Sequence, residues 1–85
     1  MNSVSARIQK LLEGQSLLIG SGNAADVRIQ GFRIATTHAR ISKVVARVFV
    51  QDLDTEHGTF VNGIEVRGAV RLNSGDLLRL SLIHI

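Results

Sequence analysis

The chain has 85 residues, a length that supports one hydrophobic core and excludes a two-domain arrangement. Hydrophobic residues make up 45% and charged residues 20%, a composition that excludes an intrinsically disordered segment. Ten Lys and Arg against seven Asp and Glu give a net charge of +3, which favours anionic partners, and the absence of Cys excludes disulfides and thiolate metal sites.

Short apolar stretches, separated by Gly, Asn, Asp and Ser at intervals of about 8–12 residues, predict an all-β sandwich or barrel. Helix signals are nearly absent. In chain order, strands are expected at residues 7–12, 16–19, 26–29, 38–43, 47–52, 59–61, 64–66 and 77–83. Turns are expected at residues 13–15, 20–23, 56–58, 62–63 and 73–76, where Gly or Asn adopts a positive φ most easily.

Two connections between strands differ in the strength of their signals. Asn62-Gly63 lies between two apolar stretches and predicts a tight hairpin. Residues 43–46 must also connect two strands, but they contain no turn former. A tight hairpin, an irregular one or a longer strand pair are all compatible with this segment.

From residue 18 onward, a set of motifs follows in a recognisable order. They are Ile19-Gly20, ADVRI at 25–29, THARI at 37–41, DLDTEHGTFVNG at 52–63 and LNSGDLLRL at 72–80. This set resembles the forkhead-associated (FHA) domain over about three quarters of the chain. The resemblance implies a β-sandwich of about eleven short, mostly antiparallel strands, whose loops at one end bind phosphothreonine peptides.

The resemblance also assigns structural roles within the sandwich. His38 is expected to organise the loops through hydrogen bonds, and Gly20, Gly58, Gly63, Gly75 and Asp76 belong to the structural motif. Inward positions are expected at Leu53, Phe60, Val61, Leu72 and Leu80. We treat residues 1–85 as a single domain with matched motifs at 18–80. Residues 1–6 are expected to be frayed, an addition from cloning, or the start of the first strand.

The residues that bind phosphate in the family are replaced in this sequence. Ser21 follows the first Gly where the family usually has an Arg, and Ala35 stands where a Ser hydroxyl donates to the phosphate. His57 takes the place of an Asn that holds the peptide backbone, and Glu56 adds a carboxylate at the rim. Losing the Arg and the Ser would remove about 3–6 kcal/mol, or two to four decades of affinity.

Other groups could compensate for these replacements. Arg28 or Arg33 could clamp a phosphate from a neighbouring position, and Ser21, Thr36 and Thr37 could donate hydroxyls. A protonated His57 could serve as a cationic donor. The candidate contact residues for a phosphopeptide or another partner are Ser21, Arg33, Thr36, Thr37, His57 and Asn62.

Other classes of site receive less support. Gly20-Ser21-Gly22 lacks the Lys of a P-loop, and His38 lacks a nucleophile and an orienting acid, so no catalytic site is expected. Asp52, Asp54 and Glu56 are interpreted as acids at a solvated strand end rather than as calcium ligands. No metal or cofactor is expected. The arginines look dispersed along the chain, which disfavours the remaining alternative, a basic nucleic-acid-binding β domain.

The sequence therefore predicts a non-enzymatic protein-interaction module of the FHA type, with weak or absent dependence on phosphate. The alternative is a phosphothreonine-binding signalling domain that uses Arg28 or Arg33. The partner is expected to be a protein or peptide. No apolar run approaches the ~18 residues of a membrane span, so a cytoplasmic location is expected, including as the cytosolic part of a larger or membrane-associated protein.

Overall fold

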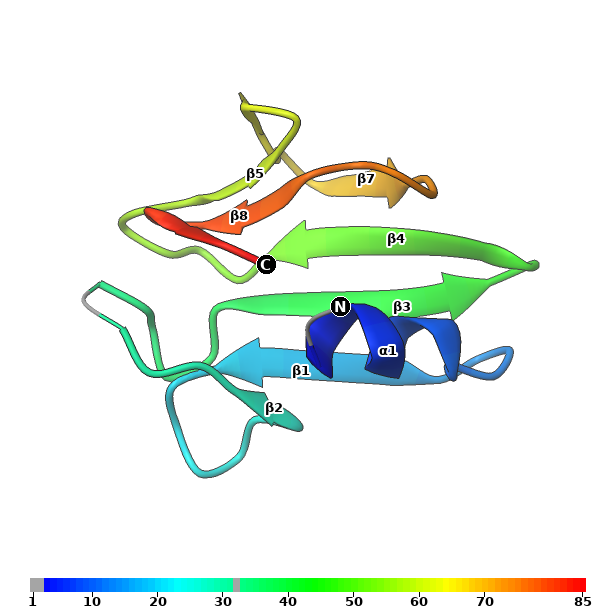
Figure 1. Cartoon of the computed structure of the whole chain (residues 1–85), viewed down its shortest axis with the longest axis horizontal. Coiled ribbons are helices and arrows are strands. Elements are labelled where there is room, and N and C mark those ends of the chain that lie inside the picture. The colour runs from blue at the N-terminus through cyan, green and yellow to red at the C-terminus, as the bar shows by residue number, and fades with distance from the viewer. Residues whose placement is uncertain (1–2, 32) are drawn as a thin grey trace.

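The computed structural model describes residues 3–31 and 33–85, which form two β-sheets packed face to face (Figure 1). Sheet A has the strand order β2-β1-β3-β4-β7, and sheet B has the order β6-β5-β8-β9. The elements are α1 (Ser3–Gln9), β1 (Ser16–Gly20), β2 (Val27–Arg28), β3 (Ala39–Val44), β4 (Arg47–Asp52), β5 (Thr59–Val61), β6 (Ile64–Glu65), β7 (Ala69–Leu72), β8 (Leu78–Leu80) and β9 (Ile83–His84). The expected all-β sandwich is confirmed, with nine strands in the described residues rather than about eleven.

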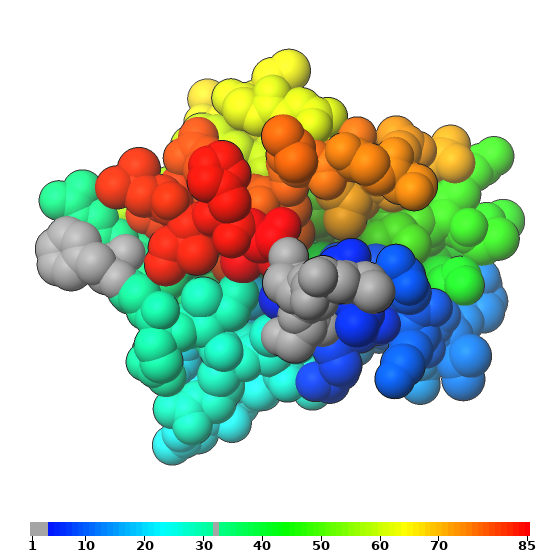
Figure 2. All heavy atoms as spheres, viewed as in Figure 1, coloured from blue at the N-terminus to red at the C-terminus, as the bar shows by residue number. Residues whose placement is uncertain are grey.

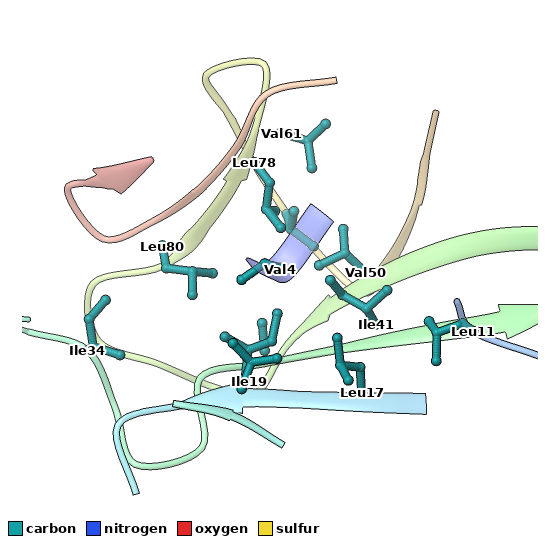
Figure 3. Close-up of a cluster of buried hydrophobic side chains, with 13 residues drawn as sticks. Val4, Leu11, Leu17, Ile19, Ile34, Ile41, Val50, Val61, Leu78 and Leu80 are labelled. Atoms are coloured by element: carbon teal, nitrogen blue, oxygen red, sulfur yellow. The ribbon is translucent and has the colours of Figure 1, made fainter. Parts of the chain in front are cut away.

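The core lies between the two sheets because strand residues alternate between an inward and an outward face. Sheet A contributes Ile19, Ile41 and Val50, and sheet B contributes Leu80, all with 0% exposed surface. Figure 3 shows these side chains in one cluster. Full burial of such a side chain stabilises the fold by about 1.5–3 kcal/mol.

The strand predicted at residues 7–12 is wrong, because the chain there belongs to α1 and the segment that follows it. Val4 and Ile8 lie four residues apart on one face of α1, and Leu11 follows three residues later, just beyond the end of the helix. Val4 and Leu11 keep only 3% and 6% of their surface exposed, and Ile8 packs against the same cluster. This helical period is the signal that the sequence reading missed.

Two further strand predictions are wrong in detail. Strand β7 was not predicted, although Val70 and Leu72 turn toward the core and alternate with exposed neighbours. Residues 77–83 form two strands, β8 and β9, rather than one, and Leu80 pairs with Ile83 around a two-residue turn. Ser81 adopts a φ of 54° in that turn, so a residue other than Gly or Asn takes the left-handed conformation there.

Phe60 was expected in the core but lies on the outer face of sheet B. Its strand neighbours Thr59 and Val61 occupy the inward positions, so alternation directs Phe60 outward. There the guanidinium carbon of Arg79 lies 4.0 Å from the ring centroid, an arrangement that favours a cation–π interaction.

The hairpin between β3 and β4 is a two-residue turn at Val45 and Ala46, which adopt φ values of 52° and 61°. Side chains disfavour this left-handed region, and β-branched Val disfavours it strongly. The carboxylate of Glu13 compensates by accepting hydrogen bonds from the N–H groups of both turn residues, at 2.8 Å from Ala46 N and more closely from Val45 N. A residue of the α1–β1 connection thus fixes a turn that its own sequence does not specify.

Replacing Val45 and Ala46 by Asn and Gly should raise the free energy of unfolding by about 1–2 kcal/mol, because Asn-Gly adopts two positive φ values with little strain. Urea denaturation followed by circular dichroism measures the change. The exposed pair Ser74→Asn and Leu77→Ser serves as a control for composition. An unchanged urea midpoint in the turn variant would show that the positive φ values of Val45 and Ala46 do not strain the fold.

The pKa of Glu13 is held below its ordinary value of 4.5, chiefly by the backbone N–H of Ala46 and then by that of Val45. Because the folded state lowers this pKa, the carboxylate stabilises the fold above its ordinary pKa, and the contribution disappears as the pH falls through the lowered value. The stability difference between the wild type and Glu13→Gln should therefore be largest near neutral pH and shrink in acid. A difference independent of pH between neutrality and pH 3 would contradict this assignment.

Candidate functional site

Three loops gather at one end of the sandwich, on the left of Figure 1: residues 21–26, 29–38 and 53–58. The N–H groups of Ser21 and Gly22 donate to the carbonyl oxygens of Ala35 and Thr36, at 3.0 Å and 3.1 Å. A third contact comes from β9, where Ile83 packs against Gly31, and Figure 2 shows the C-terminal segment in red against the green-blue segment that contains this loop. Segments far apart in the sequence therefore form one surface.

Gly20 is required at this end by close packing. A Cβ atom at this position would lie 2.1 Å from the carbonyl oxygen of Thr36, closer than any two such atoms can approach. Larger residues would push the 29–38 loop away from β1, so the glycine sets the contact between the first two loops.

The imidazole of His38 joins the second loop to the third, and it is completely buried. Its Nδ1 accepts a hydrogen bond from the Ala35 N–H at 3.1 Å, and its Nε2–H donates to the Gly58 carbonyl oxygen at 2.9 Å. An amide must donate and a carbonyl must accept, so these partners require a neutral ring with the proton on Nε2. Removing this side chain would therefore break the hydrogen bonds that connect the second loop to the third.

Asp52 organises the 53–58 loop. Its carboxylate accepts hydrogen bonds from the hydroxyls of Thr55 and Thr59, at 2.6 Å and 2.7 Å, and from the Thr55 N–H at 3.0 Å. The Thr55 hydroxyl in turn accepts from the Gly58 N–H at 3.0 Å. The interpretation of Asp52 as a solvated acid is therefore wrong. The missed signal is the Asp-x-x-Thr spacing, in which the side chain binds backbone three residues on.

Desolvation raises the pKa of Asp52, but the hydrogen bonds from the Thr55 and Thr59 hydroxyls outweigh it, with the Thr55 N–H acting in the same direction. The net effect lowers the pKa below its ordinary value of 3.8. The Asp52 carboxyl group is therefore ionised at neutral pH, and three hydrogen-bond donors within the domain stabilise its negative charge.

At Ser21 and Ala35, the two positions where the resemblance predicts phosphate contacts, the hydrogen-bond donors are already used within the domain. The Ser21 hydroxyl donates to the Ile34 carbonyl oxygen at 3.0 Å, and its backbone N–H is bound to Ala35. Ala35 has no hydroxyl, and its N–H is bound to His38. Neither residue offers a ligand a hydrogen without breaking a loop contact.

The other candidate residues of this end lie at the surface. Thr36 and Thr37 are exposed, and within residues 3–31 and 33–85 their hydroxyls make no hydrogen bond. Arg33 is exposed and adopts a φ of 70°. The Nε2 atom of His57 lies 3.8 Å from a carboxylate oxygen of Glu56, which is 88% exposed. The rim of this end thus carries charges of both signs.

Arg28 lies beside this end rather than in a loop. It is the second residue of β2 and pairs with Gly20, one residue before Ser21. Val27 is buried, so alternation directs Arg28 to the outward face of sheet A. A ligand at the loops and a ligand on this face could each contact its guanidinium.

Asn62 is not part of the loop cluster, because it lies at the opposite end of β5 from Gly58. Its amide donates to a carboxylate oxygen of Asp76 at 3.0 Å, and its side-chain oxygen accepts from the Leu77 N–H at 2.9 Å. The pKa of Asp76 is lowered, chiefly by the Asn73 N–H and then by Asn62. These bonds join the turn of Asn62 and Gly63 to the β7–β8 loop, which contains Gly75.

Two features bear on other classes of function. Among the described residues, no three His, Asp or Glu side chains are grouped so that they could hold a metal ion. The one helix found in residues 3–31 and 33–85 is too short to cross a membrane.

Comparisons with known proteins agree with this architecture. The family model described as FHA domain matches residues 17–81. The FHA domain of FhaA, in complex with the intracellular domain of Rv3910, is 32% identical with a TM-score of 0.75, over 85% of this chain and 77% of that one.

Two proteins of Mycobacterium tuberculosis are also similar. EmbR in complex with a low affinity phosphopeptide is 28% identical with a TM-score of 0.76, over 81% of this chain and 18% of that one. The FHA-2 domain of the ABC transporter Rv1747 is 29% identical with a TM-score of 0.72, over 88% and 68%. A search of curated protein sequences gave no significant match.

Asp52→Asn should lower the free energy of unfolding by about 2 kcal/mol, because one amide oxygen replaces a charged acceptor of three hydrogen bonds. The amides of Thr55 and Gly58 should also lose protection from hydrogen exchange. Asp54→Asn is the matched control, since Asp54 is exposed and Asn tolerates its φ of 57°. Equal effects of the two substitutions would contradict the role of Asp52.

Proposed function

Because the chain belongs to the FHA domain family, we propose that it is a protein-interaction module that binds its partner through the loops at the His38 end, with little or no dependence on phosphate. The observation that carries this proposal is the internal use of the Ser21 and Ala35 donors. A dianionic phosphate at that position would gain no charged hydrogen bond from either residue, and each such bond contributes about 1.5–3 kcal/mol.

The rigidity of the loop end supports a role in binding. His38 and Asp52 fix the second and third loops through buried or half-buried hydrogen bonds, so the surface that carries Thr36, Thr37 and His57 is preorganised. Preorganised loops lose little conformational entropy when a partner binds. The loops keep the hydrogen bonds of His38 and Asp52 but lack the usual phosphate donors. This combination favours recognition of the partner's peptide backbone and side chains.

The class of partner is proposed to be a protein, as in the related complex of FhaA with the intracellular domain of Rv3910. The domain is proposed to be non-enzymatic, because both ring nitrogens of its fully buried histidine, His38, are bound to backbone groups, so neither is free to act as a general base.

A second candidate function is binding of phosphothreonine peptides, as the complex of EmbR with a phosphopeptide suggests. Thr36 and Thr37 favour it, because their exposed hydroxyls are available to a ligand. Arg28, beside Gly20, or Arg33 would then supply the positive charge. This arrangement places the phosphate contacts on residues other than those of the family's motif.

Titration of the ¹⁵N-labelled domain with a phosphothreonine peptide library and its unphosphorylated counterpart separates the two candidates. The proposal expects similar amide shifts at Ser21, Thr36 and His57 with both libraries. Shifts at those residues with the phosphorylated library alone would overturn it in favour of the second candidate. Silence at the loops with both libraries at millimolar peptide would also contradict it.

Restoring the usual phosphate contacts gives a test by gain of function. The double variant Ser21→Arg and Ala35→Ser should bind the phosphorylated library about two to four decades more tightly than the wild type does, since it regains two charged hydrogen bonds. Isothermal titration calorimetry measures the change. Ser74→Arg with Ala24→Ser, at exposed sites, controls for charge and composition. No gain in affinity would contradict the assignment of these two positions.

A further inference from the structure

The outward face of sheet A concentrates positive charge. Arg28, Arg40, Arg47 and Arg71 are all exposed, and each alternates along its strand with residues that turn toward the core. The only acidic residue in the five strands of the sheet is Asp52, whose carboxylate accepts hydrogen bonds from the Thr55 and Thr59 hydroxyls. Since the whole chain carries a net charge of +3, the rest of the molecule is close to neutral.

The register of the sheet brings together arginines that look dispersed in the sequence. Phe49 pairs with Arg71 and lies two residues from Arg47, while Arg40 pairs with Gln51. Strand spacing and rise then put the Cα atom of Arg71 about 8 Å from that of Arg47 and about 12 Å from that of Arg40. The Cα atoms of Arg40 and Arg47 are about 14 Å apart. Alternate residues of an extended chain are about 7 Å apart, so one strand can reach two of these arginines.

These arginines lack the partners that other arginines of the domain have. Arg67 forms an ion pair with Glu65 at 3.0 Å, and Arg79 stacks on Phe60. Among residues 3–31 and 33–85, no carboxylate pairs with Arg28, Arg40, Arg47 or Arg71. Their positive charges are therefore available to an external anion.

A mainly apolar hollow of about 320 Å³ lies on this face, and of the four arginines Arg40 lines it. Val44, Phe49 and Ala69 line it, together with the stem of Arg40. Val44, the last residue of β3, is 48% exposed and pairs with Arg47, so a large apolar side chain is open to solvent beside an arginine. An apolar centre within a charged rim is the anatomy of a protein–protein contact.

We propose that the outward face of sheet A is a second binding surface, which takes an acidic, unphosphorylated peptide segment of a partner protein. Carboxylates of the segment pair with Arg40, Arg47 and Arg71, and one apolar side chain enters the hollow over Phe49. This surface is distinct from the loops of the proposed function, so it can hold the same partner or a different one while the loops are occupied.

Charge and aromatic content favour a peptide over other occupants. A second copy cannot use the same face, because arginine would then oppose arginine. A single-stranded nucleic acid needs exposed aromatic rings for stacking. Of the aromatic residues that the structure describes, only Phe49 lies on this face, and it is partly buried under its neighbours.

The probe is a blocked peptide of sequence EDELDEFD, added to the ¹⁵N-labelled domain at low salt. The expected result is a set of amide shifts centred on Arg40, Phe49 and Arg71, which weakens as salt screens the charges. A peptide in which Ser replaces Leu and Phe should bind more weakly. Equal affinity of the two peptides would remove the apolar hollow from the proposal.

Arg40→Glu with Arg71→Glu should weaken binding of the peptide by more than about tenfold, since it replaces two attractive contacts by repulsive ones. Lys10→Glu with Arg67→Glu makes the same change of charge on other surfaces and should leave most of the affinity. Equal loss in both variants would show only diffuse attraction and overturn the proposal.

Three further outcomes would also overturn it. These are shifts confined to the loops, silence at millimolar peptide, and tighter binding of a single-stranded DNA oligonucleotide than of the peptide on this face. The readout does not depend on the loops, so the proposal can fail while the proposed function of the loop end stands, and the reverse is equally possible.

Discussion

One buried imidazole holds the binding end of this domain together. His38 accepts a hydrogen bond from the second loop and donates one to the third, while its backbone pairs with Ile19 and Leu53. A buried polar group left without its partners costs more free energy than a single hydrogen bond contributes. Movement of either loop would leave this ring unsatisfied, so the loops are held in one arrangement before any partner arrives.

That arrangement is reinforced by a further contact between the loops. Ser21 donates its hydroxyl hydrogen to the Ile34 carbonyl oxygen and so contributes a contact between the first two loops. Under the proposed function, the loops keep these hydrogen bonds although the residues expected to contact phosphate are replaced. The residues that hold the loops and the residues proposed to contact a partner are then different ones.

The sequence predicted most of the sandwich because its strands alternate and its turns carry Gly or Asn. It did not predict α1, whose buried face depends on the widely spaced Val4 and Ile8, nor the turns at Val45 and Ser81, where neither Gly nor Asn takes the positive φ. Asp52 could have been recognised as a loop anchor from the Asp-x-x-Thr spacing. The basic face could not, because its arginines meet only through the register of strands distant in the chain.

The carboxylate that secures the β3–β4 turn also has a consequence for the order of folding. Glu13 lies more than thirty residues before Val45 and Ala46, with separations of 32 and 33, so this turn gains its support only after a large loop of chain has closed. The Asn62-Gly63 turn needs no such contact, because its own residues favour positive φ. We expect β5 and β6 to pair early and β3 and β4 to pair late, an order that φ-value analysis of the two turns would reveal.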